Sequence, residues 1–307
     1  MSTDEKDNTD SIYVNIFLSS ILFVMCLTSA PAYLHSVRSF YLIFRKGQPF
    51  YALLLFVLFT SLLNLFIAAI DGVSFWTEIS HCAVFGCFRT AILIVSSLLI
   101  AFVCVSRCIA VSSINLYKKL NKTVLLTAVS GVMMLFSIVL PVLFYKLGHI
   151  KFKYIGPPTH IGCSPVLPKK SKHTYISFIL FFLFASDFIL LVVYLVLYKR
   201  LNIHSIRPCM KKLKASARKV SLIITLTYLV LHLPLIIVYT VFSFSPTSVI
   251  SISSPMGKLL LDFALRFLSY LYSALLPTII VKTGSANEKT LSAAKKSIVH
   301  QGHANKT

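Results

Sequence analysis

Long apolar stretches separated by short polar ones dominate the chain. A helix needs about 20 residues to cross the hydrocarbon core of a bilayer, which is about 30 Å thick. Seven stretches are long enough, at approximately 12–37, 50–71, 83–111, 123–145, 175–199, 219–244 and 257–281. Backbone polar groups in lipid must be paired within the protein, which favours helices over open strands. The pattern therefore predicts an all-α fold, a bundle of seven transmembrane helices.

Composition supports a membrane protein. Hydrophobic residues make up 57% of the chain and charged residues 13%, with a mean hydropathy of +0.82. Soluble domains carry about 25% charged residues. Residues 1–11 are net acidic, unlike the cationic start of a cleaved signal peptide, so we expect the first helix to remain as an anchor. We expect a short extracellular N-terminus over 1–11, one membrane domain over 12–282 and a cytoplasmic tail over 283–307.

The basic residues predict the orientation. With the N-terminus outside, the loops and tail on the inner side carry most of the Lys and Arg residues, as in multi-pass proteins of the plasma membrane. The exception is the outer loop 146–174, which holds six lysines. The net charge of +21 then reflects topology and contact with anionic membrane lipids. No soluble basic module is evident, so nucleic acid is not an expected partner.

Two cysteines lie where the outer face is expected. Cys82 opens the third apolar segment, and Cys163 lies in the middle of the loop 146–174. Thiols on the oxidising side of a membrane can form a disulfide, here joining the loop to the top of the third helix. The pattern also allows two free thiols, or Cys87 in place of Cys82, because a disulfide needs Cα atoms within about 7 Å.

The third apolar segment ends in Ser106-Arg107-Cys108, and Arg107 lies 25 residues after Cys82. The spacing is similar to that of the rhodopsin-like (class A) G-protein-coupled receptors. In that family the same distance separates a cysteine that opens helix three from the arginine of an Asp/Glu-Arg-Tyr motif. The resemblance implies that Ser106, Arg107 and Cys108 couple the protein to a heterotrimeric G protein.

The sixth and seventh segments extend the resemblance over about residues 12–282. Pro234 matches the kink proline of helix six, and His232 stands where a tryptophan is usual. Pro277 matches the proline of the Asn-Pro-x-x-Tyr motif in helix seven. These three residues are the expected switch. His232 is interpreted as a core histidine packed beside the kink, in preference to a metal ligand.

The chain departs from the family pattern at many positions. Leu276 and Ile280 replace the asparagine and tyrosine of the helix-seven motif, and Ser106 replaces the acid next to Arg107. The stretch LLLFVLFTSLLNLFIAA in the second segment has no aspartate, so the family's sodium site is expected to be absent. This pattern resembles fast-evolving receptors, including those of herpesviruses, for which the location would be a host cell membrane.

Ionisable residues within transmembrane segments are costly and indicate function. Arg89 lies in the third segment, whereas Asp262 and Arg266 lie four residues apart in the seventh. One interpretation is that Arg89 and Arg266 bind the carboxylate or phosphate of an anionic ligand, with Tyr239 adding a hydroxyl. The other is structural: Asp262 neutralises Arg266 or bridges to Arg89.

The inner face carries two further signals. A serine at 106 offers Arg107 only a neutral hydrogen bond, worth about 1 kcal/mol against about 1.5–3 for a charged partner. We therefore expect a weak resting lock and ligand-independent activity. Residues 285–299 combine a capping box with an apolar face and predict an amphipathic helix on the membrane.

The expected function is that of a rhodopsin-like receptor without a cofactor, whose ligand is unknown. The alternative is a receptor-derived protein that acts as a decoy or immune-modulating binding partner with little coupling. An enzyme is not expected, because no nucleophile–base set, metal-ligand spacing or phosphate-binding glycine loop is evident.

Overall fold

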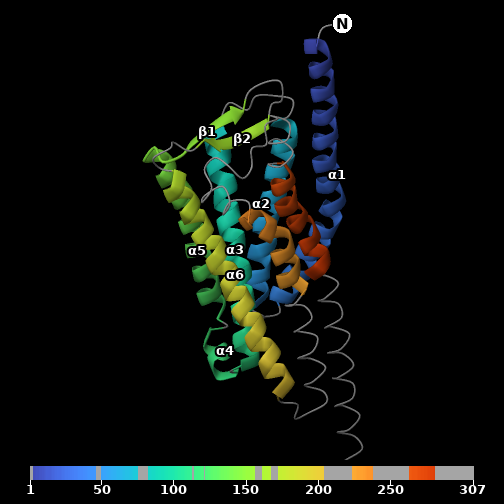
Figure 1. Ribbon diagram of the computed structural model, residues 1–307. Helices are drawn as coiled ribbons and strands as arrows, with labels where there is room; N and C mark the ends of the chain where they lie inside the picture. Colours follow the sequence, from blue (N-terminus) through green and yellow to red (C-terminus); the bar gives the residue numbers. More distant parts are fainter. Residues whose placement is uncertain are drawn as a thin grey trace, which may run out of the picture.

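The computed structural model describes residues 3–45, 50–74, 82–112, 114–120, 122–155, 161–166, 172–203, 223–237 and 263–280. The elements are α1 (Thr3–Arg45), α2 (Phe50–Ser74), α3 (Cys82–Ser112), α4 (Ile114–Leu120), α5 (Thr123–Lys146), β1 (Lys151–Ile155), β2 (Ile161–Val166) and α6 (Lys172–Ile203). Two further helices, drawn in orange and red in Figure 1, are Ile223–Ile237 and Phe263–Ile280.

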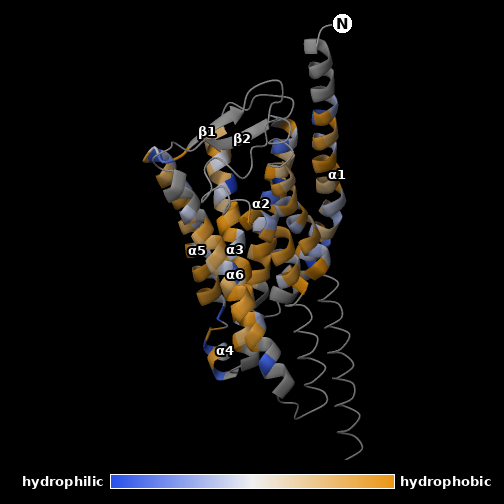
Figure 2. Ribbon diagram, in the orientation of Figure 1, coloured by the Kyte–Doolittle hydropathy of each residue, from blue (hydrophilic) through white to orange (hydrophobic). Residues whose placement is uncertain are grey.

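Helices form in every predicted apolar segment. Within the described part of the chain, five are long and apolar enough to cross a membrane: Tyr13–Tyr41, Ala52–Val73, Cys82–Ser106, Thr123–Lys146 and Phe263–Ile280. Leu180–Val196 and Ile223–Ile237 are apolar but shorter. Hydrophobic residues run along the helices of the bundle, and polar residues gather near α4 and the turn after α5 (Figure 2). The helical architecture is confirmed, and its composition is that of a membrane protein.

The helix α3 lies at the centre of the bundle and contacts α2, α5 and α6 (Figure 1). Its side chains Ile94 and Leu99 are fully buried. The helix α1 packs along α2. Residues along α3 can therefore contact several other helices.

Two helices differ from the expectation. The helix α1 has 43 residues, about 65 Å, and begins nine residues before the predicted segment. It therefore extends past the rest of the bundle at its N-terminal end (Figure 1). The short helix α4 was not predicted, because its seven residues are too few for a periodic pattern to be recognised.

The loop 146–174 contains an antiparallel hairpin, a detail that was not predicted. Strands β1 and β2 pair with Lys151 opposite Val166 and Tyr154 opposite Cys163. The hairpin contacts α3, and β2 also contacts α2. The alternation of lysine with aromatic residues in β1 is the period-two signal of a strand, but the stretch is only five residues long. The hairpin lies at the opposite end of the bundle from α4 (Figure 1).

The helical hydrogen bond that Pro277 cannot make in the last helix is replaced by one from α1. Pro277 has no N–H, so it leaves the carbonyl four residues earlier, that of Ser273, without its helical partner. The Tyr33 hydroxyl of α1 donates to this carbonyl at 2.7 Å. The Ser36 hydroxyl, also of α1, donates to the Ala32 carbonyl of its own helix at 2.7 Å and lies 3.3 Å from the Pro277 carbonyl. Freed backbone groups in lipid need such partners, so the last helix depends on α1 at this proline.

We expect Tyr33→Phe to lower the free energy of unfolding by about 1–3 kcal/mol, because it leaves the buried Ser273 carbonyl without a donor. Thermal unfolding of the purified protein measures this loss. Tyr13→Phe is the matched control, since Tyr13 lies on the same helix and is 70% exposed. Equal stability of the two variants would contradict the role of Tyr33.

Candidate functional site

Asp71 on α2 links three helices near the hairpin end of the bundle. Its Oδ2 atom lies 3.4 Å from Nη1 of Arg89 on α3 and 3.6 Å from Nη1 of Arg266 on the helix Phe263–Ile280. The same oxygen of Asp71 accepts a hydrogen bond from the Tyr270 hydroxyl at 2.5 Å. The charged side chains are 13–17% exposed. We call Asp71, Arg89, Arg266 and Tyr270 the acidic clasp.

The local helix geometry explains how the clasp assembles. Arg266 and Tyr270 are four residues apart, so both lie on the same face of their helix. Asp71 lies in the last turn of α2, and Arg89 lies two turns into α3. The helices α2 and α3 contact each other, and the hairpin contacts both.

The clasp adds an acid that was not predicted as a partner of the arginines. Asp71 lies next to both Arg89 and Arg266, whereas the predicted pairing with Asp262 stays a prediction. Asp262 and Tyr239 lie outside the described residues. The sequence did contain a signal for Asp71. It is the last residue of the predicted segment 50–71, where an unpaired carboxylate is costly, so a basic partner could have been expected.

A buried ion pair of this kind is sensitive to the loss of one partner. Desolvation largely cancels the attraction between the charges, so the pair adds little to stability over a well-packed apolar core. Removing the shared carboxylate, however, leaves two cations without their counter-charge and costs about 3–5 kcal/mol. The clasp therefore links α2, α3 and the last helix through one carboxylate oxygen.

A polar link joins the middle of α2 to the last helix. The Asn64 side-chain amide donates to the Ser273 hydroxyl at 2.9 Å and to the Ser269 carbonyl at 3.3 Å. Asn64 is 6% exposed. The sequence analysis noted only that an aspartate is absent from this stretch and so missed the contact. Asn64 and Tyr33 approach Ser273 from two different helices, which anchors the last helix on both.

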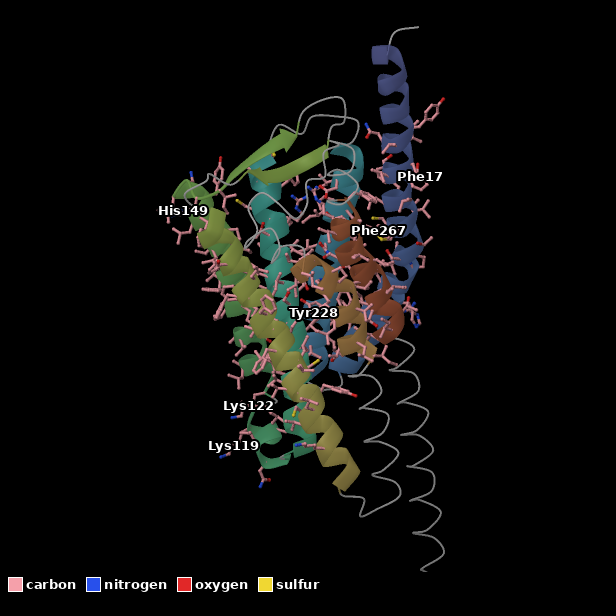
Figure 3. The ribbon with its side chains drawn as sticks, in the orientation of Figure 1. Phe17, Lys119, Lys122, His149, Tyr228 and Phe267 are labelled. Carbon is pink, nitrogen blue, oxygen red and sulfur yellow. The ribbon has the colours of Figure 1, made fainter. Side chains whose placement is uncertain are left out.

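An aromatic cluster fills the bundle core next to the clasp's helices. Tyr228, labelled in Figure 3, stacks on His232 with ring centroids 4.1 Å apart, and Tyr272 meets both rings edge-on at 5.3 and 5.4 Å. The Tyr228 hydroxyl donates to the Ser97 hydroxyl of α3 at 2.5 Å. The cluster connects α3 with the helices Ile223–Ile237 and Phe263–Ile280 through side chains that are all fully buried or nearly so.

His232 lies in this cluster as the sequence predicted. Its side chain is 2% exposed, and its Nδ1 lies 3.2 Å from the Tyr228 carbonyl. A carbonyl only accepts, so Nδ1 carries the proton. Pro234 follows two residues later and is half-buried, whereas Pro277 is buried. The interpretation of His232 as a core histidine with a hydrogen-bond partner is confirmed, and the three predicted switch residues lie on the two helices that pack in this core.

The opposite end of α3 carries the predicted coupling residues. The helix continues without a break to Ser112, so Ser106, Arg107 and Cys108 are helical. Ser106 and Cys108 are half-buried, and the Arg107 side chain is outside the described residues. Ser106 lines an apolar cavity of about 130 Å³ between α3, α4 and α5. A serine in place of an acid keeps this cavity uncharged.

The cysteine that opens α3 lies under the hairpin. Cys82 is 9% exposed, and the free cysteines in the described part of the chain are Cys26, Cys87, Cys104 and Cys108. The predicted partner Cys163 lies in β2, opposite Tyr154, and its side chain is outside the described residues. The predicted amphipathic helix 285–299 also lies outside them.

Comparison with models of known protein families finds no match, and no curated protein is significantly similar to the chain.

Proposed function

We propose that this protein is a seven-helix membrane receptor of the rhodopsin-like kind, with its N-terminus outside, which signals through heterotrimeric G proteins from the plasma membrane. The observation that carries the proposal is the position of α3. This helix joins Cys82 under the hairpin to Ser106-Arg107-Cys108 at the other end, and 25 helical residues span about 37 Å. A single central helix thus connects an outer site with an inner coupling site.

The acidic clasp supports an outer site for an anionic ligand. A guanidinium carries five N–H donors, so a ligand carboxylate or phosphate can bind Arg89 and Arg266 in addition to, or in place of, the Asp71 carboxylate. A ligand that competes with Asp71 loosens the contact between α2 and the last helix. The aromatic cluster and Pro234 lie along the path from there to Arg107, and outward movement of the helix Ile223–Ile237 about Pro234 is the proposed activating step.

The hairpin supports the disulfide that the sequence suggested. Strand β2, which contains Cys163, contacts α3, which begins at Cys82, and Cys82 is absent from the free cysteines. A bond between these two residues would hold the hairpin over the outer site. Cys87 is a free thiol, so it is not the alternative partner.

The proposal predicts signalling without a ligand. We expect expression of the wild type in cells to change G-protein activity, measured by energy-transfer sensors for each Gα class. Ser106→Asp should lower this basal signal, because a carboxylate holds Arg107 with a charge-assisted bond worth about 1.5–3 kcal/mol. Thr127→Asp is the control, since it adds the same charge at an exposed position of α5 near the same end. A Ser106→Asp signal equal to or above the wild type, at equal surface level, would refute the weak lock.

The alternative, a decoy or immune-modulating partner that binds without coupling, predicts a different result. Many residues of the family's switch are replaced, Leu276 and Ile280 among them, and both are buried core residues here. A protein of this kind would leave G-protein activity unchanged in every sensor while still reaching the cell surface.

A further inference from the structure

The cavity beside Ser106 has the features of a site for a hydrocarbon chain. It has a volume of about 130 Å³ and is lined by Val105 and Ile109 of α3, Tyr117 of α4, and Leu126 and Val129 of α5, among others. Apolar cavities of about 150 Å³ stay dry and accept apolar molecules of the size of benzene. The cavity therefore suits part of an acyl chain and is too small for a whole lipid.

The cavity lies at the level where one candidate membrane span ends and the next begins, which is where headgroups are expected. The candidate spans Cys82–Ser106 and Thr123–Lys146 end and begin at this level. Ser106 lines the cavity, and Leu125 does so two residues into the second span. Next to it, Val124 is 82% exposed. An apolar cavity at this depth meets the first methylenes of a lipid chain, directly below the lipid phosphate.

Two exposed cations flank the cavity. Lys119 precedes the lining residue Leu120 in α4, and Lys122 directly precedes α5. Both side chains are exposed, and Figure 3 shows both next to α4, on the periphery of the bundle at the end opposite the hairpin. Lysines near an anionic membrane surface contribute about 1 kcal/mol each to binding. An anionic headgroup would therefore complement the positive charge of these two lysines.

The chain itself offers few anions to these lysines. No Asp or Glu occurs between Glu78 and Asp187, nor between Asp187 and Asp262. The residues before α2 at this end, 46–49, and the connection 204–222 are likewise without an acid. Only Glu288 of the tail remains. Charge complementarity therefore points to an anion from outside the chain.

We propose that the cavity between α3, α4 and α5 binds the upper part of an acyl chain of an anionic membrane phospholipid, whose phosphate binds Lys119 and Lys122. The bound lipid packs against Ser106 and thus links the lipid composition of the membrane to the coupling end of α3. The inference goes beyond the proposed receptor function and does not depend on it, because a lipid can occupy the site whether or not the protein couples.

The test uses the full chain in phosphatidylcholine vesicles that contain a phosphatidylglycerol probe with a diazirine near the carbonyl of one chain. After irradiation, mass spectrometry locates the labelled peptides. We expect labelling of the cavity residues of α3, α4 and α5. Val129→Phe fills the cavity and should remove the label, whereas the matched control Val132→Phe, at a position 67% exposed on the same helix, should not.

Substitutions of the two lysines test whether their charge contributes to lipid binding. Both side chains are exposed, so their replacement should leave the fold intact. Lys119→Gln and Lys122→Gln should each reduce phosphatidylglycerol labelling about fivefold, the equivalent of about 1 kcal/mol. Lys146→Gln at the other end of α5 is the control and should change nothing. Equal labelling by a phosphatidylcholine probe, or labelling unaffected by Val129→Phe, would overturn the proposal. Labelling by a diazirine fatty acid but not by phosphatidylglycerol would overturn the choice of a phospholipid.

Discussion

Asp71→Asn is expected to lower the free energy of unfolding by about 3–5 kcal/mol and to reduce the amount of protein at the cell surface. The substitution removes the negative charge that Arg89 and Arg266 share on one oxygen atom. Two cations then face each other in a site that is largely screened from water, where like charges repel strongly. Thermal unfolding of the detergent-purified protein and surface labelling in cells measure the two effects.

The single arginine variants provide the internal comparison. Arg89→Gln or Arg266→Gln still leaves the Asp71 carboxylate one cation and the Tyr270 hydroxyl. Each is therefore expected to destabilise the protein less than Asp71→Asn does. Combining Asp71→Asn with Arg266→Gln should recover part of the lost stability, because the repulsion disappears.

A second membrane-embedded acid supplies the matched control. Asp187 lies in the middle of α6, and its Oδ1 atom has no hydrogen-bond partner among the described residues. Asp187→Asn breaks no ion pair in the described part of the chain and should therefore change stability by less than Asp71→Asn does. If Asp71→Asn unfolds at the same temperature as Asp187→Asn, the clasp does not hold the helices together.

The sequence was sufficient to predict helices where length and hydropathy decide the structure. Segments 83–111 and 123–145 match α3 and α5 within one residue at each end, because a bilayer requires continuous apolar helices of a fixed length. The hairpin was missed because its strands have only five and six residues. Such short alternations also occur in loops.

The contacts between helices could not be read from the sequence in the same way. Arg89 and Arg266 were identified by their cost in lipid, which depends on each residue alone. The partner Asp71 depends on how three helices pack, and no periodicity specifies that. The same holds for Tyr33 and the Ser273 carbonyl, which are 240 residues apart. A rule for finding them does exist: a proline within a transmembrane helix frees a carbonyl that needs a donor from elsewhere.

Arg107→Ala is expected to reduce ligand-independent G-protein activation in cells to the level of cells without the protein. Under the proposed receptor function, Arg107 at the end of α3 faces the C-terminal helix of the Gα subunit. Alanine removes the guanidinium with its five donors while it preserves the helix, since alanine has the highest helix propensity. The variant should therefore reach the surface normally and fail only in coupling.

The matched control for this substitution is Arg38→Ala. Arg38 is an exposed arginine on α1, towards the C-terminal end of that helix. Its loss removes the same charge without touching α3, so signalling should persist. A parallel loss in both variants would indicate a general effect of charge at the membrane and would argue against a specific role of Arg107.

The most direct test is nucleotide exchange on purified heterotrimeric G proteins, with the protein reconstituted in lipid nanodiscs and no ligand added. The account predicts that the wild type accelerates exchange on at least one Gα class, that Arg107→Ala does not, and that Arg38→Ala behaves as the wild type. Folded wild-type protein that leaves exchange at the rate of empty nanodiscs for every Gα class would contradict the receptor function and favour a binding partner without coupling.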